Sequence, residues 1–182
     1  MFLENLRPNR LHHLFGSGSA WSSVVIKDWL IANKIKGTIR FYGTPAEEGG
    51  SGKVYMARAG LFNDVDVALH WHPGSVSHAR PRTSNSNKSA KFTFKGISAH
   101  AASAPEQGRS ALDGVESMNM MVNLMREHIP QDSRIHYVIT KGGLAPNVIP
   151  DEAQVYYYVR HPKRTMVANL FERVALAAKG AA

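Results

Sequence analysis

Ala90-Lys91-Phe92-Thr93-Phe94-Lys95 (AKFTFK, residues 90–95) is the stretch that decides the fold of the second half of the chain. Its phenylalanines alternate with polar residues, which is typical of a β-strand with one buried face. An amphipathic helix follows at residues 110–127, then strands at 134–140 and 154–160 and a helix at 165–178. This strand–helix–strand–strand–helix order predicts an α+β, ferredoxin-like domain without its last strand.

The segments on either side of this domain differ from it in composition. Residues 179–182 (KGAA) stand where the last strand is expected to begin, so we expect the chain to be truncated there. Residues 75–88 are rich in serine, asparagine, proline and arginine, which indicates a linker between domains. We therefore predict a first domain at residues 1–78, a linker at 79–87 and a second domain at 88–182.

The first half predicts an α/β arrangement. A helix at residues 17–32 and a short helix at 53–59 alternate with a strand at 38–42 and a shorter apolar strand at 66–69. Two adjacent carboxylates, Glu47 and Glu48, follow the first of these strands in the sequence GTPAEEGG. Open α/β sheets place ligands at the carboxyl ends of their strands. The pair therefore suits one carboxylate that binds a metal and a neighbour that moves a proton from water.

Histidines supply further potential metal ligands in the first half. His12 and His13 lie near its start, and His70 and His72 follow the second expected strand. Imidazole and carboxylate together suit zinc or another divalent transition metal. Taken singly, each histidine is more often an ordinary surface or core residue. Their joint arrangement with the carboxylates at strand ends favours a metal site as much as it favours that alternative.

Composition narrows the classes of function. The 182 residues include no cysteine, which excludes a disulfide framework and a thiolate nucleophile. Neither a membrane-spanning stretch nor a signal peptide is visible, so we expect a cytoplasmic protein with no membrane partner. The net charge of +8 is spread along the chain without a nucleic-acid-binding signature. Solvated surface charge or an anionic substrate is therefore favoured over nucleic acid.

Several long motifs resemble the M20 metallopeptidases, and within them the amidohydrolase branch of aminobenzoyl-glutamate hydrolases, aminoacylases and indole-acetyl-amino-acid hydrolases. They are residues 37–74 (from GTIRFYGTPAEEGG to ALHWHPG), 96–102 (GISAHAA), 142–151 (GGLAPNVIPD) and 156–160 (YYYVR). The resemblance implies that the first domain is a partial catalytic domain and the second a lid that also serves dimerisation.

The resemblance also implies roles for single residues of the first domain. Glu47 matches the general base, and His12, Glu48 and His70 match metal ligands. The intact family holds two zinc or manganese ions. Arg10, however, stands where the family has a cysteine ligand, and a guanidinium cannot bind a metal. Because the family's last histidine ligand also lies beyond this chain, we expect it to bind fewer ions or none.

Three lid residues match functional positions of the family. His100 resembles the histidine that polarises the scissile carbonyl, often across a dimer, while Asn147 and Arg160 resemble residues that hold the substrate's carboxylate or carbonyl. Their alternatives are a surface histidine, a turn residue and an exposed charge at a strand end.

The resemblance implies a metal-dependent amidohydrolase that cleaves the amide bond of a small-molecule N-acyl or aminobenzoyl amino acid, such as aminobenzoyl-glutamate, and forms a homodimer through the lid. The alternative is a catalytically inactive, truncated fragment that retains the lid as a dimerisation module.

Overall fold

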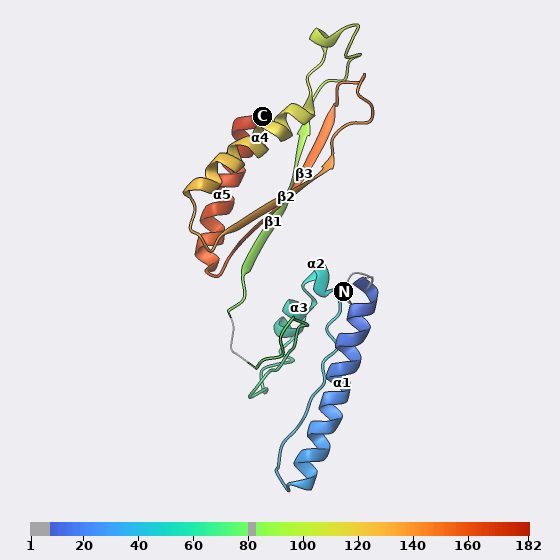
Figure 1. Cartoon of the computed structure of the whole chain (residues 1–182), viewed down its shortest axis with the longest axis vertical. Helices are drawn as coiled ribbons and strands as arrows, with labels where there is room; N and C mark the ends of the chain where they lie inside the picture. Colours follow the sequence, from blue (N-terminus) through green and yellow to red (C-terminus); the bar gives the residue numbers. More distant parts are fainter. Residues whose placement is uncertain (1–7, 80–82) are drawn as a thin grey trace. The chain divides into compact units, whose positions relative to one another are not determined.

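The computed structural model describes residues 8–79 and 83–182 (Figure 1). The chain divides into two compact units, Met1–Ala79 and Arg80–Ala182. We refer to them as unit 1 and unit 2.

Unit 2 has the predicted order of elements. It runs through β1 (Ser86–Lys95), α4 (Ala111–Met125), β2 (Arg134–Lys141), β3 (Glu152–His161) and α5 (Arg164–Ala181). The strands form one antiparallel sheet in the order β1-β3-β2, so β3, the last in sequence, lies in the middle (Figure 1). Single-turn 3-10 helices follow β1 at Pro105–Gln107 and α4 at Arg126–His128.

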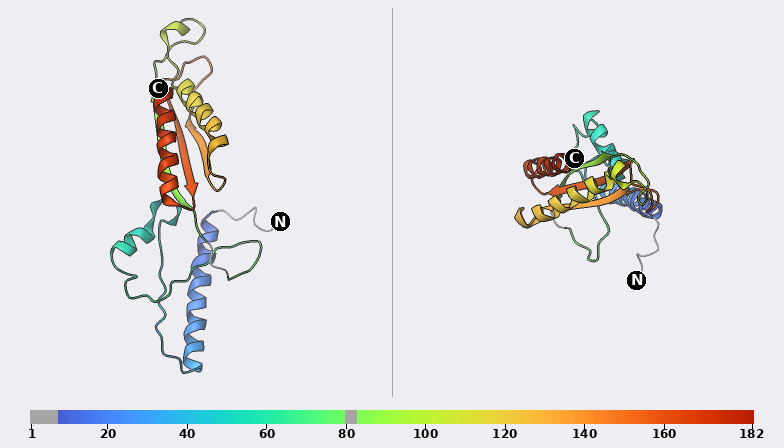
Figure 2. Two further views of the ribbon diagram at one scale, coloured as in Figure 1. Left: turned by 90° about the vertical axis from the view of Figure 1, so that its left-hand side faces the viewer. Right: turned by 90° about the horizontal axis from the view of Figure 1, so that it is seen from above.

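One face of this sheet carries the core. Alternate residues of β3 are buried there, and α4 and α5 cover them (Figure 2). Tyr157, at the centre of β3, donates its hydroxyl hydrogen bond to the buried side-chain oxygen of Asn119 on α4. Burial raises the pKa of Tyr157. The other core residues are apolar: Phe94, Ala111, Val115, Met118, Val122, Ile135, Ala153, Val155, Val159, Val167, Leu170 and Val174.

The opposite face of the sheet, which we call the open face, has no helix of unit 2 packed on it among the described residues. The second set of alternating residues of β3 lies on it, from Glu152 at one end to Arg160 at the other. Strand register places their partners from β1 and β2 on the same face.

Two element ends in unit 2 differ from the prediction. Strand β1 begins at Ser86 instead of Ala90, because residues 86–89 also pair with β3. Helix α5 continues to Ala181, so the start of a strand expected at residues 179–182 is wrong. The physical reason is that Ala177, Ala178 and Ala181 pack against the core from successive helical turns.

In unit 1 the predicted helices are confirmed. Helix α1 (Pro8–Ala32) contains the expected helix and begins nine residues before it, and α3 (Gly52–Arg58) lies at the expected short helix. Gly60, with φ of 76°, follows the end of α3. In the described parts of both units, no helix combines the length and apolar character needed to cross a membrane.

The strands predicted at 38–42 and 66–69 are wrong, because no strand forms in the described residues of unit 1. Side chains hold the first segment instead of a ladder of backbone hydrogen bonds. Arg40 makes two hydrogen bonds to the carboxylate of Asp64, at 2.5 and 2.6 Å, and Tyr42 donates to the Leu61 carbonyl at 2.7 Å. Ile39 and Phe41 line a hollow beside α1. The α/β sheet expected here is therefore not formed by these residues.

Candidate functional site

The loop that carries His100 is joined to the loop that carries Asn147 by backbone hydrogen bonds. Residues 96–110 follow β1 and residues 142–151 precede β3, so both loops leave the same end of the sheet (Figure 1). The Ala101 amide donates to the Asn147 carbonyl at 3.0 Å, and an isolated β-bridge pairs His100 with Val148. The structure thus brings two of the predicted site residues together.

The imidazole of His100 has a defined orientation. Its Nδ1 accepts hydrogen bonds from the amides of Ala102 at 3.3 Å and Ser103 at 3.2 Å. A nitrogen that accepts carries no proton, so we assign the neutral ring a proton on Nε2. The side chain is exposed, and its Nε2–H is therefore a donor that a ligand can reach.

Close backbone packing at Gly96 supports this arrangement. A Cβ atom at this position would lie 2.1 Å from the carbonyl oxygen of Arg109 and 2.8 Å from the nitrogen of Ala111. The Gly96 amide donates to the carbonyl of Asp151 at 2.7 Å. Only glycine allows the chain to pass so close to two other segments at the base of the His100 loop.

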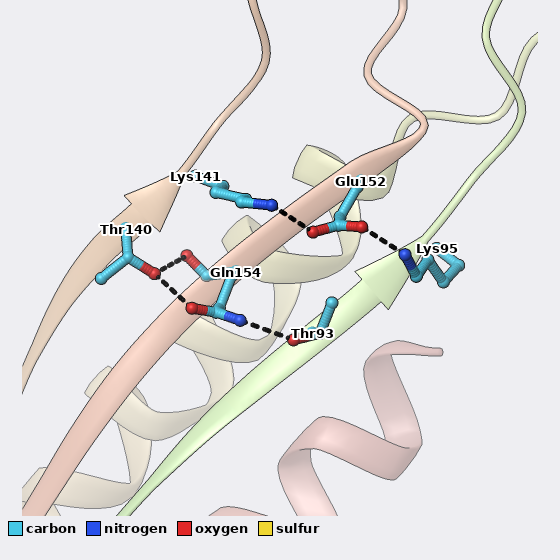
Figure 3. Close-up of polar contacts among 6 residues, drawn as sticks. All are labelled: Thr93, Lys95, Thr140, Lys141, Glu152 and Gln154. Atoms are coloured by element: carbon cyan, nitrogen blue, oxygen red, sulfur yellow. Dashed lines mark hydrogen bonds and ion pairs between the residues drawn. The ribbon is translucent and has the colours of Figure 1, made fainter.

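A polar cluster crosses all three strands at the base of both loops. Glu152 accepts from Lys141 of β2 at 2.7 Å and also pairs with Lys95 of β1, as Figure 3 shows. Hydrogen bonds to Lys141 and then to Lys95 lower the pKa of Glu152 to about 2. The carboxylate therefore stays ionised and links the ends of the three strands.

A neutral row runs beside this cluster. Gln154 of β3 donates to the Thr93 hydroxyl at 2.8 Å and accepts from the Thr140 hydroxyl at 2.9 Å (Figure 3). Both edge strands are thus tied to the central strand through side chains at the His100 end.

Arg160 lies at the opposite end of β3, eight residues from Glu152. At about 3.3 Å per residue the two ends are roughly 26 Å apart. Its guanidinium carbon lies 5.1 Å from the ring centroid of Tyr158. The structure therefore does not bring Arg160 together with His100 and Asn147 in one chain.

In unit 1 the segments of His12 and His70 approach each other through their neighbours. Phe15 of α1 contacts Trp71 edge-on, with ring centroids 5.0 Å apart, and Trp71 donates its Nε1–H to the Ser19 hydroxyl at 3.0 Å. His12 lies three residues before Phe15 in α1, about 4.5 Å along the helix axis. The backbone thus places His12 and His70 on adjoining segments, although the side chain of His12 is outside the described residues.

Glu47 and Glu48 begin α2 (Glu47–Gly50), a single helical turn. Ala46 and Ser51, on either side of it, both have φ of 54°, in the left-handed region that non-glycine residues seldom occupy. Such strain is frequent where backbone positions functional groups. The Glu47 side chain is exposed, and that of Glu48 lies outside the described residues.

The residue types predicted as metal ligands suit a divalent metal, but the described side chains are not arranged around one point. Carboxylate and imidazole are the ligands that zinc and manganese take. Among the side chains that the structure describes, however, no three of the His, Asp and Glu type gather closely enough to hold an ion. The metal centre therefore stays a prediction from the sequence.

Sequence reasoning missed the residues that link the site loops to the sheet. Glu152, Lys95 and Lys141 lie at strand ends, and only the register of three strands shows that they meet. For Gly96 a signal was present, since glycine directly after a strand often marks a close backbone approach.

Comparison with known proteins identifies the second half of the chain. Residues 83–181 match the family model described as the peptidase dimerisation domain of the M20 proteins. This match covers more than half of the chain and includes His100, Asn147 and Arg160.

Two relatives extend the likeness into the first half. A subunit of the p-aminobenzoyl-glutamate hydrolase of Escherichia coli is 46% identical over 172 residues, which are 94% of this chain and 36% of that protein. The Xaa-Arg dipeptidase of Mus musculus is 35% identical over 121 residues, which are 66% of this chain and 28% of the relative. The chain thus spans about a third of the length of these relatives.

A crystal structure of the aminobenzoyl-glutamate utilization protein from Klebsiella pneumoniae has a TM-score of 0.45 to this structure, at 25% identity. The alignment covers 52% of this chain and 24% of that one. The assignment rests on the family match and on the identity to the Escherichia coli hydrolase. The chain belongs to the M20 family of peptidases and amidohydrolases and carries that family's dimerisation domain at residues 83–181.

Proposed function

We propose that this chain serves an amidohydrolase that cleaves the amide bond of an N-acyl or aminobenzoyl amino acid, such as aminobenzoyl-glutamate. The observation that carries the proposal is the presentation of His100. Its Nδ1 accepts from two backbone amides, which leaves Nε2–H as the donor of an exposed ring on a loop that is hydrogen-bonded to the loop of Asn147. A donor fixed in this way can stabilise the negative charge that develops on an amide oxygen under attack by water. The names of the relatives supply the substrate class.

The remaining roles fall to residues of unit 1. Glu47 would accept the proton of the attacking water and pass it to the leaving amine. His12, Glu48 and His70 would hold a divalent metal ion, zinc or manganese, which when bound lowers the pKa of a water molecule.

The separation of His100 and Arg160 supports a site shared by two subunits. An amide substrate of this class is much shorter than the roughly 26 Å between the two ends of β3. If Arg160 holds the substrate's carboxylate and His100 its carbonyl, the two residues must come from different chains. The presence of a dimerisation domain agrees with this arrangement. We therefore propose a homodimer in which each site receives His100 and Asn147 from the partner subunit.

The test is release of p-aminobenzoate from p-aminobenzoyl-glutamate, with zinc or manganese added. We expect Glu47→Gln and His100→Ala each to remove nearly all activity. Mixed after dissociation and reassociation, the two inactive variants should recover about a quarter of the wild-type rate, because half of the dimers are mixed and each mixed dimer holds one intact site.

Failure of the mixture to recover activity, with both variants dimeric, would disprove the shared site. A second candidate, a dimerisation module without activity, is favoured by Arg10 at the position of a family ligand. Dimer formation by light scattering, with neither metal uptake nor hydrolysis, would establish that candidate instead.

A further inference from the structure

The Arg160 end of the open face carries two guanidinium groups on adjacent strands. Arg134 of β2 and Arg160 of β3 are direct partners in the strand register, and both are exposed. Directly paired residues of antiparallel strands have Cα atoms about 4.5–5.5 Å apart and side chains on the same face. The two cations therefore lie side by side on the surface that the helices leave uncovered.

Neither arginine has an acidic partner among the residues that the structure describes. In the described part of the chain, no ion pair joins Arg134 or Arg160 to a carboxylate, while the cations at the other end of this face share Glu152. Like charges directly opposite each other destabilise a sheet. Such a pair costs stability unless an anion binds between the two groups.

The contacts of both side chains leave donors free for a ligand. Arg134 uses Nη1 to donate to the carbonyls of Gln131 and Ser133, both at 2.6 Å. Its Nε and Nη2 hydrogens take no part in these bonds. Arg160 rests over the ring of Tyr158 and is exposed. Backbone carbonyls on one side and an aromatic ring on the other thus limit the freedom of the two guanidinium groups before any ligand binds.

We propose that Arg134 and Arg160 form a binding site for a dicarboxylate, with one guanidinium for each carboxylate. The planar fork of arginine matches a carboxylate with two parallel hydrogen bonds. Asn87 of β1, the other register partner of Arg160, adds an amide on the same face. This inference rests on the proposed function for the identity of the ligand as the amino-acid part of the substrate, and it narrows that part to an acidic amino acid such as glutamate. Arg134 then sets the specificity for an acidic amino acid, because it binds only the second carboxylate.

The experiment compares two probes that differ by one carboxylate, N-acetyl-L-glutamate and N-acetyl-L-glutamine. Binding to the whole chain, without added metal, is followed through the NMR signals of the arginine Nε–H groups. We expect wild-type protein to bind the dicarboxylate at least about 10-fold more tightly, a difference of about 1.4 kcal/mol. Arg134→Gln should abolish this preference while leaving N-acetyl-L-glutamine binding unchanged. Arg160→Gln should weaken both.

Arg173→Gln is the matched control, since it removes the same charge from α5. It should preserve the preference, and the thermal unfolding of each variant shows whether it is folded. A wild-type chain that binds both probes equally or neither, or a folded Arg134→Gln variant that keeps the preference, would overturn the inference. Binding without hydrolysis would retain the dicarboxylate site while the proposed activity fails. Hydrolysis without a preference for N-acetyl-L-glutamate over N-acetyl-L-glutamine would retain the proposed activity while the dicarboxylate site fails.

Discussion

The two ends of the sheet in unit 2 are stabilised in different ways. At the His100 end, two loops exchange backbone hydrogen bonds, and Glu152 forms ion pairs with a lysine from each edge strand. At the Arg160 end, two arginines face each other in the strand register, and no carboxylate of the described residues pairs with either of them. The charged groups of the first end form ion pairs within the chain, whereas the second end leaves cationic donors available.

This difference suits the two tasks that we propose for the two ends of β3. A residue that must donate one well-aimed hydrogen bond needs a rigid loop, which the packing at Gly96 and the contacts of His100 provide. A residue that must capture an anion needs free donors and uncompensated charge. The contrast predicts that substitutions at the two ends affect different properties.

Gly96→Ala should have the largest effect, because it disturbs the backbone packing on which the His100 end depends. The added methyl group would meet backbone atoms of two segments, residues 109–111 and, at 3.0 Å, the carbonyl oxygen of Pro150. Backbone atoms cannot move aside as a side chain can. We therefore expect the free energy of unfolding to fall by about 1–3 kcal/mol. Urea denaturation measures this loss.

Gly142→Ala is its control in the neighbouring loop. There the nearest atom to an added Cβ is a methyl carbon of Ile139 at 3.6 Å, an ordinary contact. Gly142→Ala should therefore leave the free energy of unfolding nearly unchanged. Equal losses in the two variants would show that close packing is not what distinguishes Gly96.

Arg134→Glu should give the Arg160 end an ion pair between neighbouring strands, like the pairs that Glu152 forms at the other end. The introduced carboxylate would face Arg160 across the β2–β3 register and replace a repulsive pair with an attractive one. We expect a gain in stability of at most about 1 kcal/mol, together with loss of N-acetyl-L-glutamate binding. Calorimetric unfolding and NMR titration measure the two effects.

Arg173→Glu makes the same change of charge on α5. A gain of equal size in that variant would attribute the effect to the net charge of +8 rather than to the pairing with Arg160.

The fold of unit 2 could be predicted because its local patterns agree with its tertiary contacts. Phe92 and Phe94 face the helices as their alternation requires, and Ser110 caps α4 by accepting from the Asp113 amide. In unit 1 the same reasoning failed for residues 38–42. Their β-branched and aromatic residues favour a strand, but a strand exists only where another pairs with it. Contacts of Arg40 and Tyr42 hold that segment in another way.

The candidate site could be predicted to a similar, limited extent. The motifs named His100 and Asn147 as site residues, and the structure joins the two loops, 47 positions apart in the sequence, through the Ala101 amide. The position of Arg160 at the far end of β3 and its pairing with Arg134 depend on register, which the sequence does not state. Residue types could therefore be named in advance, whereas their grouping could not.

Glu152→Gln should have the smallest effect and an informative dependence on pH. The pKa of Glu152 is lowered from its ordinary value of 4.5 to about 2 by Lys141 first and Lys95 second. A carboxyl group with a lowered pKa in the folded state contributes stability that is present above its unfolded pKa and is lost as the pH falls toward the folded value. Wild-type protein should therefore lose more stability than Glu152→Gln between about pH 4.5 and 2, and the stabilities of the two proteins should converge at the acid end.

Urea denaturation across this range tests the prediction, with Glu172→Gln on α5 as control. Parallel curves for wild-type and Glu152→Gln protein would mean that the carboxylate does not link the three strands in solution, and the contrast between the two ends would then rest on the backbone of the His100 loops alone.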